Sequence, residues 1–152
     1  MKKALLLLLA GAVMACTGCA HTAAEEPKAC KVEVYSDGGE LLRTIDDQET
    51  VGLLTPTEDW LDTEAPQPEP AAQYELVVWQ EKTLLAGEDP EGEREYEVIL
   101  NLTLYQDSPL VKAAISPQAV KNMKLPEEML TDYYTLSDEA IASLRQAIGQ
   151  SE

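Results

Sequence analysis

Histidine, cysteine and positive charge are all scarce in this 152-residue chain. The only histidine, His21, lies in a small polar segment near the N-terminus, so we expect no histidine-based triad or histidine zinc site in a folded domain. Three cysteines are too few for a disulfide-rich scaffold. Lysine and arginine together number 11 against 28 acidic residues, which gives a formal charge of −17. Because binding to nucleic acid or anionic lipid needs clustered basic residues, this balance argues against both partners.

Long apolar runs are also lacking, except for one near the N-terminus. Lys2 and Lys3 precede an uncharged segment, residues 4–13, which contains five consecutive leucines. This segment is too short to span a bilayer, which takes about 20 apolar residues, but it has the length of a secretory signal. Small residues and two cysteines, Cys16 and Cys19, follow it. In this order of charge, apolar run, small residue and cysteine, the leader resembles a bacterial lipoprotein signal with its lipobox.

The resemblance implies cleavage before a cysteine that then carries a lipid. Cys16 has an aliphatic residue three positions back, Val13, and a small one directly before it, Ala15. Cys19 follows Gly18, which suits cleavage, but it has an unusual cysteine three positions back. Cys16 therefore fits the pattern better, and both cysteines remain candidates for lipidation. A secretory signal without lipidation is the alternative interpretation.

The predicted organisation has three parts: a signal peptide over residues 1–18, a flexible tether over 19–30 and a single acidic domain over 31–150. Loss of Lys2 and Lys3 with the leader would leave a mature chain with a charge near −19. A negative surface of this size keeps a protein soluble and needs no charged partner to explain it. The resemblance implies a lipid anchor in the cell membrane, with the domain on its extracytoplasmic face.

Cysteine pairing depends on which cysteine is lipidated. With the lipid on Cys16, Cys19 and Cys30 can form a disulfide outside the cell. With the lipid on Cys19, Cys30 stands alone as a partly buried thiol. No metal-ligand or redox spacing surrounds Cys30.

The sequence of the domain predicts an α+β fold that begins with a β-hairpin. Residues 31–35 alternate polar and apolar side chains, and residues 40–45 form the returning strand after a glycine-rich turn. Asp46 and Glu49 resemble a capping box, which predicts a short helix directly after the hairpin.

A second group of strands follows a proline-rich segment. Residues 74–79, 96–104 and 110–115 predict an antiparallel meander, because their connections are too short for parallel crossovers. Short helices are expected to begin at Pro117 and Pro126. Alternation in the middle strand predicts one wholly apolar face, formed by Tyr96, Val98, Leu100, Leu102 and Leu104.

A C-terminal helix over residues 138–148 is expected to cover this sheet. Ser137 is a good N-cap and Gly149 a natural stop. The helix carries one apolar stripe, which we expect to pack on one sheet face: Ile141, Leu144 and Ile148 against Val98, Leu100 and Leu102. Together these elements resemble the small α+β domains of lipoproteins of unknown function.

Aromatic residues supply two candidate sites. Trp60 lies among acidic residues beside the proline-rich loop at 65–70. It is a candidate anchor for a partner, although packing back onto the sheet is the favoured interpretation. Tyr133 and Tyr134 are adjacent, and neighbouring strand residues point to opposite faces. We therefore expect one core tyrosine and one surface tyrosine rather than a joint polar site.

Acidic residues crowd one loop, and their oxygen atoms suit hard cations. Their spacing matches no standard calcium loop, so a solvated acidic loop is expected, with no metal and no cofactor. The loop contains Glu88, Asp89, Glu91, Glu93 and Glu95.

These observations favour a non-catalytic domain that binds an unknown protein or small-molecule ligand at the membrane. A structural or accessory subunit of a cell-envelope complex is the first alternative. A carboxylate-based hydrolase is the second, because the 28 acids offer many carboxylate pairs. No nucleophile–base arrangement and no glycine-rich phosphate loop supports catalysis.

Overall fold

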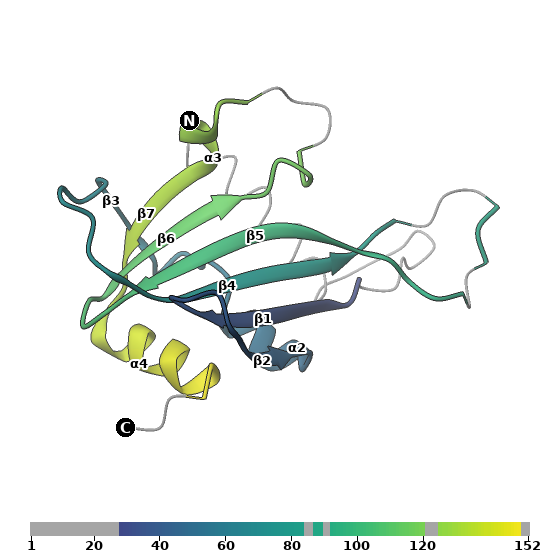
Figure 1. The fold of residues 1–152 in the computed structure, drawn as a ribbon, viewed down its shortest axis with the longest axis horizontal. Helices are drawn as coiled ribbons and strands as arrows, with labels where there is room; N and C mark the ends of the chain where they lie inside the picture. The colour runs from purple at the N-terminus through teal and green to yellow at the C-terminus, as the bar shows by residue number, and fades with distance from the viewer. Residues whose placement is uncertain (1–27, 84–86, 90–91, 121–124, 150–152) are drawn as a thin grey trace.

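The part of the chain that the structure describes forms one seven-stranded antiparallel sheet with three helices, which confirms the predicted α+β class (Figure 1). The computed structural model describes residues 28–83, 87–89, 92–120 and 125–149. The strand order is β2-β1-β4-β5-β6-β7-β3. The elements are β1 (Cys30–Ser36), β2 (Leu41–Ile45), α2 (Gln48–Leu53), β3 (Leu61–Thr63), β4 (Ala72–Glu81), β5 (Tyr96–Tyr105), β6 (Leu110–Ile115), α3 (Glu127–Leu130), β7 (Thr131–Thr135) and α4 (Asp138–Ala147).

The N-terminal hairpin and its helix form as predicted, with two local differences. β1 begins at Cys30, a residue that the sequence placed at the end of the tether, and it pairs with both β2 and β4. Helix α2 is capped by Asp47 instead of Asp46, because the Asp47 carboxylate accepts hydrogen bonds from the backbone amide and the hydroxyl of Thr50, at 2.9 and 2.6 Å. Asp46 uses its carbonyl oxygen to accept a hydrogen bond from the Gln48 side chain. No capping box therefore forms.

The predicted meander is present as β4, β5 and β6. β7 extends it, and β3 forms the edge beyond β7. The helix expected at Pro117 is only a turn, whereas the one expected at Pro126 is the single helical turn of α3. Within the described residues both segments are short, so the sheet carries most of the fold.

A β-bulge divides β5 into parts that face opposite sides of the sheet. Val78 pairs with Leu100, but the next residue, Trp79, pairs with Val98, so Ile99 is an extra residue. Ile99 is buried at 4% exposure, whereas Val98 is half-buried on the side of Trp79. The predicted apolar face is therefore correct from Leu100 onward and wrong before it. The only break in the alternation at this point is Ile99 itself, an apolar residue at a position expected to be polar.

Helices α2 and α4 cover one face of the sheet (Figure 1). Leu144 and Ile148 of α4 are 1% and 7% exposed and belong to the same apolar core as Leu100 and Leu102, whereas Ile141 is only partly buried. The prediction that the C-terminal helix packs on one sheet face is therefore confirmed, whereas the predicted full burial of Ile141 and the place of Val98 on that face are wrong. Ser137 caps the helix and Gly149, at φ 89°, ends it, as expected.

The other side of the sheet, which we call the outer face, carries polar and aromatic side chains. The side chains on this face alternate along each strand with side chains that point into the core. They are Lys31, Glu33, Tyr35, Val77, Trp79, Thr103, Lys112 and Tyr133. Among the described helices, none has both the length and the apolar character needed to cross a membrane.

Candidate functional site

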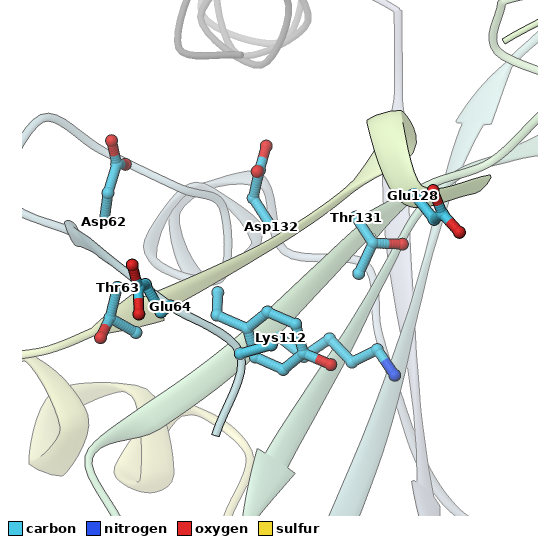
Figure 2. A pocket seen from close by; sticks show the side chains of 9 residues that line it. Asp62, Thr63, Glu64, Lys112, Glu128, Thr131 and Asp132 are labelled. Atoms are coloured by element: carbon cyan, nitrogen blue, oxygen red, sulfur yellow. The ribbon is translucent and has the colours of Figure 1, made fainter. Parts of the chain in front are cut away.

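A pocket of about 630 Å³ opens beside β7 (Figure 2). β3 pairs with β7 over only three residues, and Thr63 opposite Tyr133 is the last pair. Beyond this pair the chain leaves β7, and the pocket lies between the two segments. It is lined by Asp62, Thr63, Glu64, Ala65, Lys112, Glu128, Thr131, Asp132 and Tyr133.

The chemistry of the pocket is polar, with one cation and one aromatic ring. The Lys112 ammonium lies 5.8 Å from the centre of the Tyr133 ring and 3.4 Å from Glu69 Oε1. Burial lowers the pKa of Lys112, but Tyr133 and Glu69 outweigh this effect and raise the pKa above its ordinary value. Lys112 is therefore fully charged at neutral pH. Thr131 and the carboxylate of Glu128 lie on the same side of the pocket as this ammonium (Figure 2).

Hydrogen bonds hold the proline-rich loop beside the pocket. It connects β3 at the sheet edge to β4, and Glu69 in it accepts hydrogen bonds from the Tyr105 hydroxyl and from Lys112. Tyr105 is only 1% exposed, and burial, together with its bond to Glu69, raises the pKa of its hydroxyl. The Tyr105 hydrogen bond lowers the pKa of Glu69. The predicted loop is exposed over most of its length, but it bends at residues 67–68 and is held to the sheet at Glu69.

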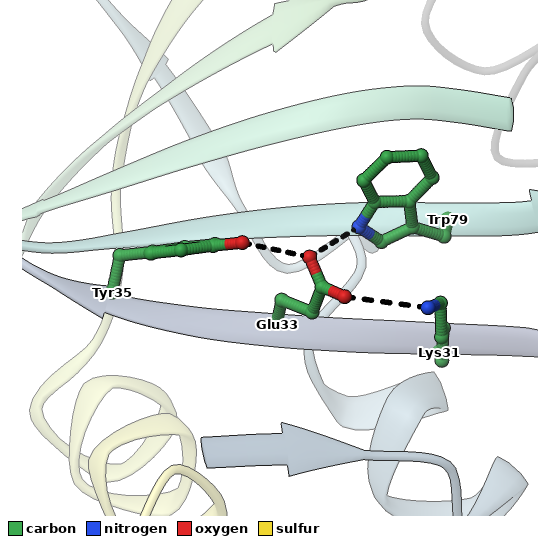
Figure 3. A network of polar contacts seen from close by, with 4 residues as sticks. All are labelled: Lys31, Glu33, Tyr35 and Trp79. Carbon is green, nitrogen blue, oxygen red and sulfur yellow. Dashed lines mark hydrogen bonds and ion pairs between the residues drawn. The ribbon is translucent and has the colours of Figure 1, made fainter. Parts of the chain in front are cut away.

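A second polar cluster, which we call the outer-face cluster, lies on β1, β4 and the start of β5, and Figure 3 shows its members on β1 and β4. The Glu33 carboxylate accepts hydrogen bonds from the Tyr35 hydroxyl and the Trp79 indole, both at 2.8 Å, and from Lys31 at 3.3 Å. The Lys31 ammonium also lies 5.3 Å from the ring centres of both Trp79 and Tyr96. Burial alone would raise the pKa of Glu33, but the three donors outweigh it and lower the pKa. Glu33 is therefore ionised at neutral pH.

The aromatic residues singled out in the sequence pack into the fold. Trp60 is 7% exposed, and its ring meets that of Tyr134 edge to face, with centroids 5.7 Å apart. It packs inward, as favoured, and does not present the exposed ring that an anchor for a partner requires. Tyr134 is a core residue at 6% exposure, whereas Tyr133 is half-buried and lines the pocket. The prediction of one core and one surface tyrosine is confirmed.

The other predicted positions lie partly beyond the described residues. Cys16 and Cys19, together with the signal peptide and most of the tether, fall outside them. Cys30 is buried at 3% exposure, and its sulfur accepts a weak hydrogen bond from the Gln80 amide at 3.7 Å. In the acidic loop, Glu91 is outside the described residues, and Glu95 forms an ion pair with Lys82 at 2.6 Å. Within the described ranges, no three histidine, cysteine or acidic side chains are placed to hold a metal ion.

Sequence analysis missed both the pocket and the outer-face cluster. Every second residue of a strand points to the same face, so the spacing alone places Lys31, Glu33 and Tyr35 on one face of β1. The same argument would have offered Trp79 as a partner, had the pairing of β1 with β4 been known. The pocket had no local signal, because it depends on where β3 stops pairing with β7.

Comparison with protein-family models, with curated proteins and with solved structures gives no match to this chain.

Proposed function

We propose that this protein is a membrane-anchored, extracytoplasmic lipoprotein whose folded domain binds a ligand without catalysing a reaction. The leader supports the anchor, since it combines charge, an apolar run, small residues and cysteine. Each buried methylene of an acyl chain contributes about 0.8 kcal/mol, and two or more chains hold a protein stably to a bilayer. The anchor lies on Cys16 or Cys19, only a short tether away from the start of β1.

The pocket beside β7 is the observation that carries ligand binding. Its volume of about 630 Å³ falls within the range of small-molecule sites, roughly 300–1,000 Å³. Lys112, the Thr131 hydroxyl and the Tyr133 ring offer a charge, a hydrogen-bonding group and a flat apolar surface. These groups suit a small polar ligand.

The lining gives little support for catalysis. It contains no histidine, cysteine or serine. Four carboxylates also line it, those of Asp62, Glu64, Glu128 and Asp132, and a carboxylate-based hydrolase would need two of them on either side of the bond that it cleaves. Because Lys112, Thr131 and Tyr133 suit ligand binding directly, we favour a binding role and keep the carboxylate-based hydrolase as the alternative.

A thermal-shift screen with a library of small polar molecules tests this proposal. Ala65 lines the pocket, whereas Ala71, also exposed in the same loop, does not. Ala65→Trp should fill the pocket and abolish the shift caused by any hit, and Ala71→Trp should leave that shift unchanged. A library without hits, or hits that Ala65→Trp does not affect, would remove the pocket as the binding site.

An accessory subunit of a cell-envelope complex is the second candidate. Both edge strands expose leucines: Leu41 and Leu42 on β2 are 49% and 51% exposed, and Leu61 on β3 is 66% exposed. Exposed apolar residues on edge strands favour contact with another chain. Recovery of a stoichiometric complex from mildly solubilised membranes, lost on Leu41→Lys with Leu42→Lys, would favour this role over a free-standing binding protein.

A further inference from the structure

The outer-face cluster already holds an ammonium group. Lys31 places its charged nitrogen over two aromatic rings, Trp79 and Tyr96, and beside the Glu33 carboxylate. Tyr35 and Trp79 fix that carboxylate through hydrogen bonds from the other side (Figure 3). A cation that touches two ring faces and a carboxylate has the surroundings that proteins use to recognise alkylammonium groups.

Lys31 holds this position only weakly. Its side chain remains 31% exposed, and its nitrogen is 3.3 Å from the nearest Glu33 oxygen. Partly exposed ion pairs and cation–π contacts are each weak, since water competes for the ammonium. The lysine can therefore swing into solvent on its flexible stem and leave the rings and the carboxylate in place. The carboxylate side of the site is more rigid, because Glu33 is only 15% exposed and has two further donors.

We propose that Glu33, Trp79 and Tyr96 form a binding site for a soluble quaternary ammonium compound, with Lys31 as the internal group that the ligand displaces. A primary ammonium is strongly hydrated and gains little on leaving water for aromatic faces. A trimethylammonium group has no N–H to solvate, and its methyl groups can cover both rings. The ligand therefore has an advantage over Lys31 that a second primary amine lacks. The negative charge of the chain also favours a cation.

This site is separate from the pocket beside β7, so either can exist without the other. The two share no residue: the pocket is lined by β3 and the two residues after it, β6, α3 and β7, whereas the cluster lies on β1, β4 and β5.

Indole NMR signals provide the test. The chain has two tryptophans, and one of them, Trp60, is buried in the core as an internal reference. The full-length chain in maltoside micelles is titrated with tetramethylammonium chloride, with sodium chloride and ethanolamine hydrochloride as controls. The Trp79 indole signal should shift saturably with tetramethylammonium, and much less with either control, while the Trp60 signal stays in place.

Substitutions distinguish Lys31, which the ligand displaces, from Glu33, which binds the ligand. Lys31→Met keeps the stem and removes the competing charge, so it should tighten binding by about tenfold. Glu33→Gln should weaken it at least as much. Lys82→Met, which removes an exposed lysine paired with Glu95, should leave the affinity unchanged.

Three results would overturn the proposal. The first is no saturable Trp79 shift in the wild type and in Lys31→Met, and the second is an equal response to ethanolamine. The third concerns the source of the ligand: a shift with micelles that contain a phosphocholine detergent, but none with tetramethylammonium, would indicate a lipid headgroup in place of a soluble compound.

Discussion

Replacement of Leu144 by alanine should strongly destabilise the domain. The Leu144 side chain is 1% exposed, belongs to the apolar core and is the buried residue of α4. Leucine-to-alanine changes at such sites cost about 2–5 kcal/mol, since they remove apolar contact and leave a cavity. Arg145 still holds α4 through hydrogen bonds to the Gln73 side chain and the Tyr105 carbonyl, at 2.9 and 3.0 Å. We therefore expect a loss near the middle of that range, about 3 kcal/mol.

Urea unfolding followed by circular dichroism measures this loss. In a thermal melt, it should lower the midpoint by roughly 10 °C for a domain of this size. Gln146→Ala is the matched control, because Gln146 is exposed on the same helix and should change stability by less than about 0.5 kcal/mol. Equal effects of the two substitutions, or a loss below about 1 kcal/mol for Leu144→Ala, would refute the docking of α4.

Further substitutions test the sheet and its outer face. The β5 bulge buries Ile99 and leaves Val98 on the outer face, so Ile99→Asp should abolish folding and Val98→Asp should lower the free energy of unfolding only slightly. Urea unfolding measures both, and greater damage from Val98→Asp than from Ile99→Asp would show that β5 alternates without a bulge. Leu100→Asp should likewise unfold the domain, whereas Thr103→Asp on the outer face should remain folded, and equal damage would mean that both faces are buried. Glu33→Gln should flatten the acid dependence of stability: because the pKa of Glu33 lies below its ordinary 4.5 in the fold, its contribution is present above that value and lost as pH falls through the folded pKa. Urea midpoints of the wild type and of Glu33→Gln, measured as pH falls below 4.5, check this dependence. Identical pH profiles of the two proteins would contradict the role of Glu33.

Local patterns predicted the elements of this fold well. The hairpin, the meander and α4 each follow from alternation, capping residues or an apolar stripe, which are properties of neighbouring residues. The insertion of β1 beside β4 and the pairing of β3 with β7 join segments far apart in the chain. No local pattern specifies these pairings.

The candidate sites were less predictable for the same reason. Glu33 has an ordinary place in an alternating strand, and only the register with β4 brings the Trp79 indole to its carboxylate. Ile99 was the one local hint of the bulge, as an apolar residue at a position expected to be polar. Trp60 shows the opposite case, because its acidic neighbours suggested exposure while its own apolar area favoured the core.

Mass spectrometry of the mature N-terminus tests the anchor most directly. Protein recovered from membranes should begin at Cys16 or Cys19 and carry a diacylglyceryl group on that cysteine. Of the single variants Cys16→Ser and Cys19→Ser, one should accumulate as an uncleaved precursor and the other should mature normally. A mature chain that begins at a residue other than these cysteines, or a cysteine at the N-terminus without lipid, would contradict the proposed lipoprotein.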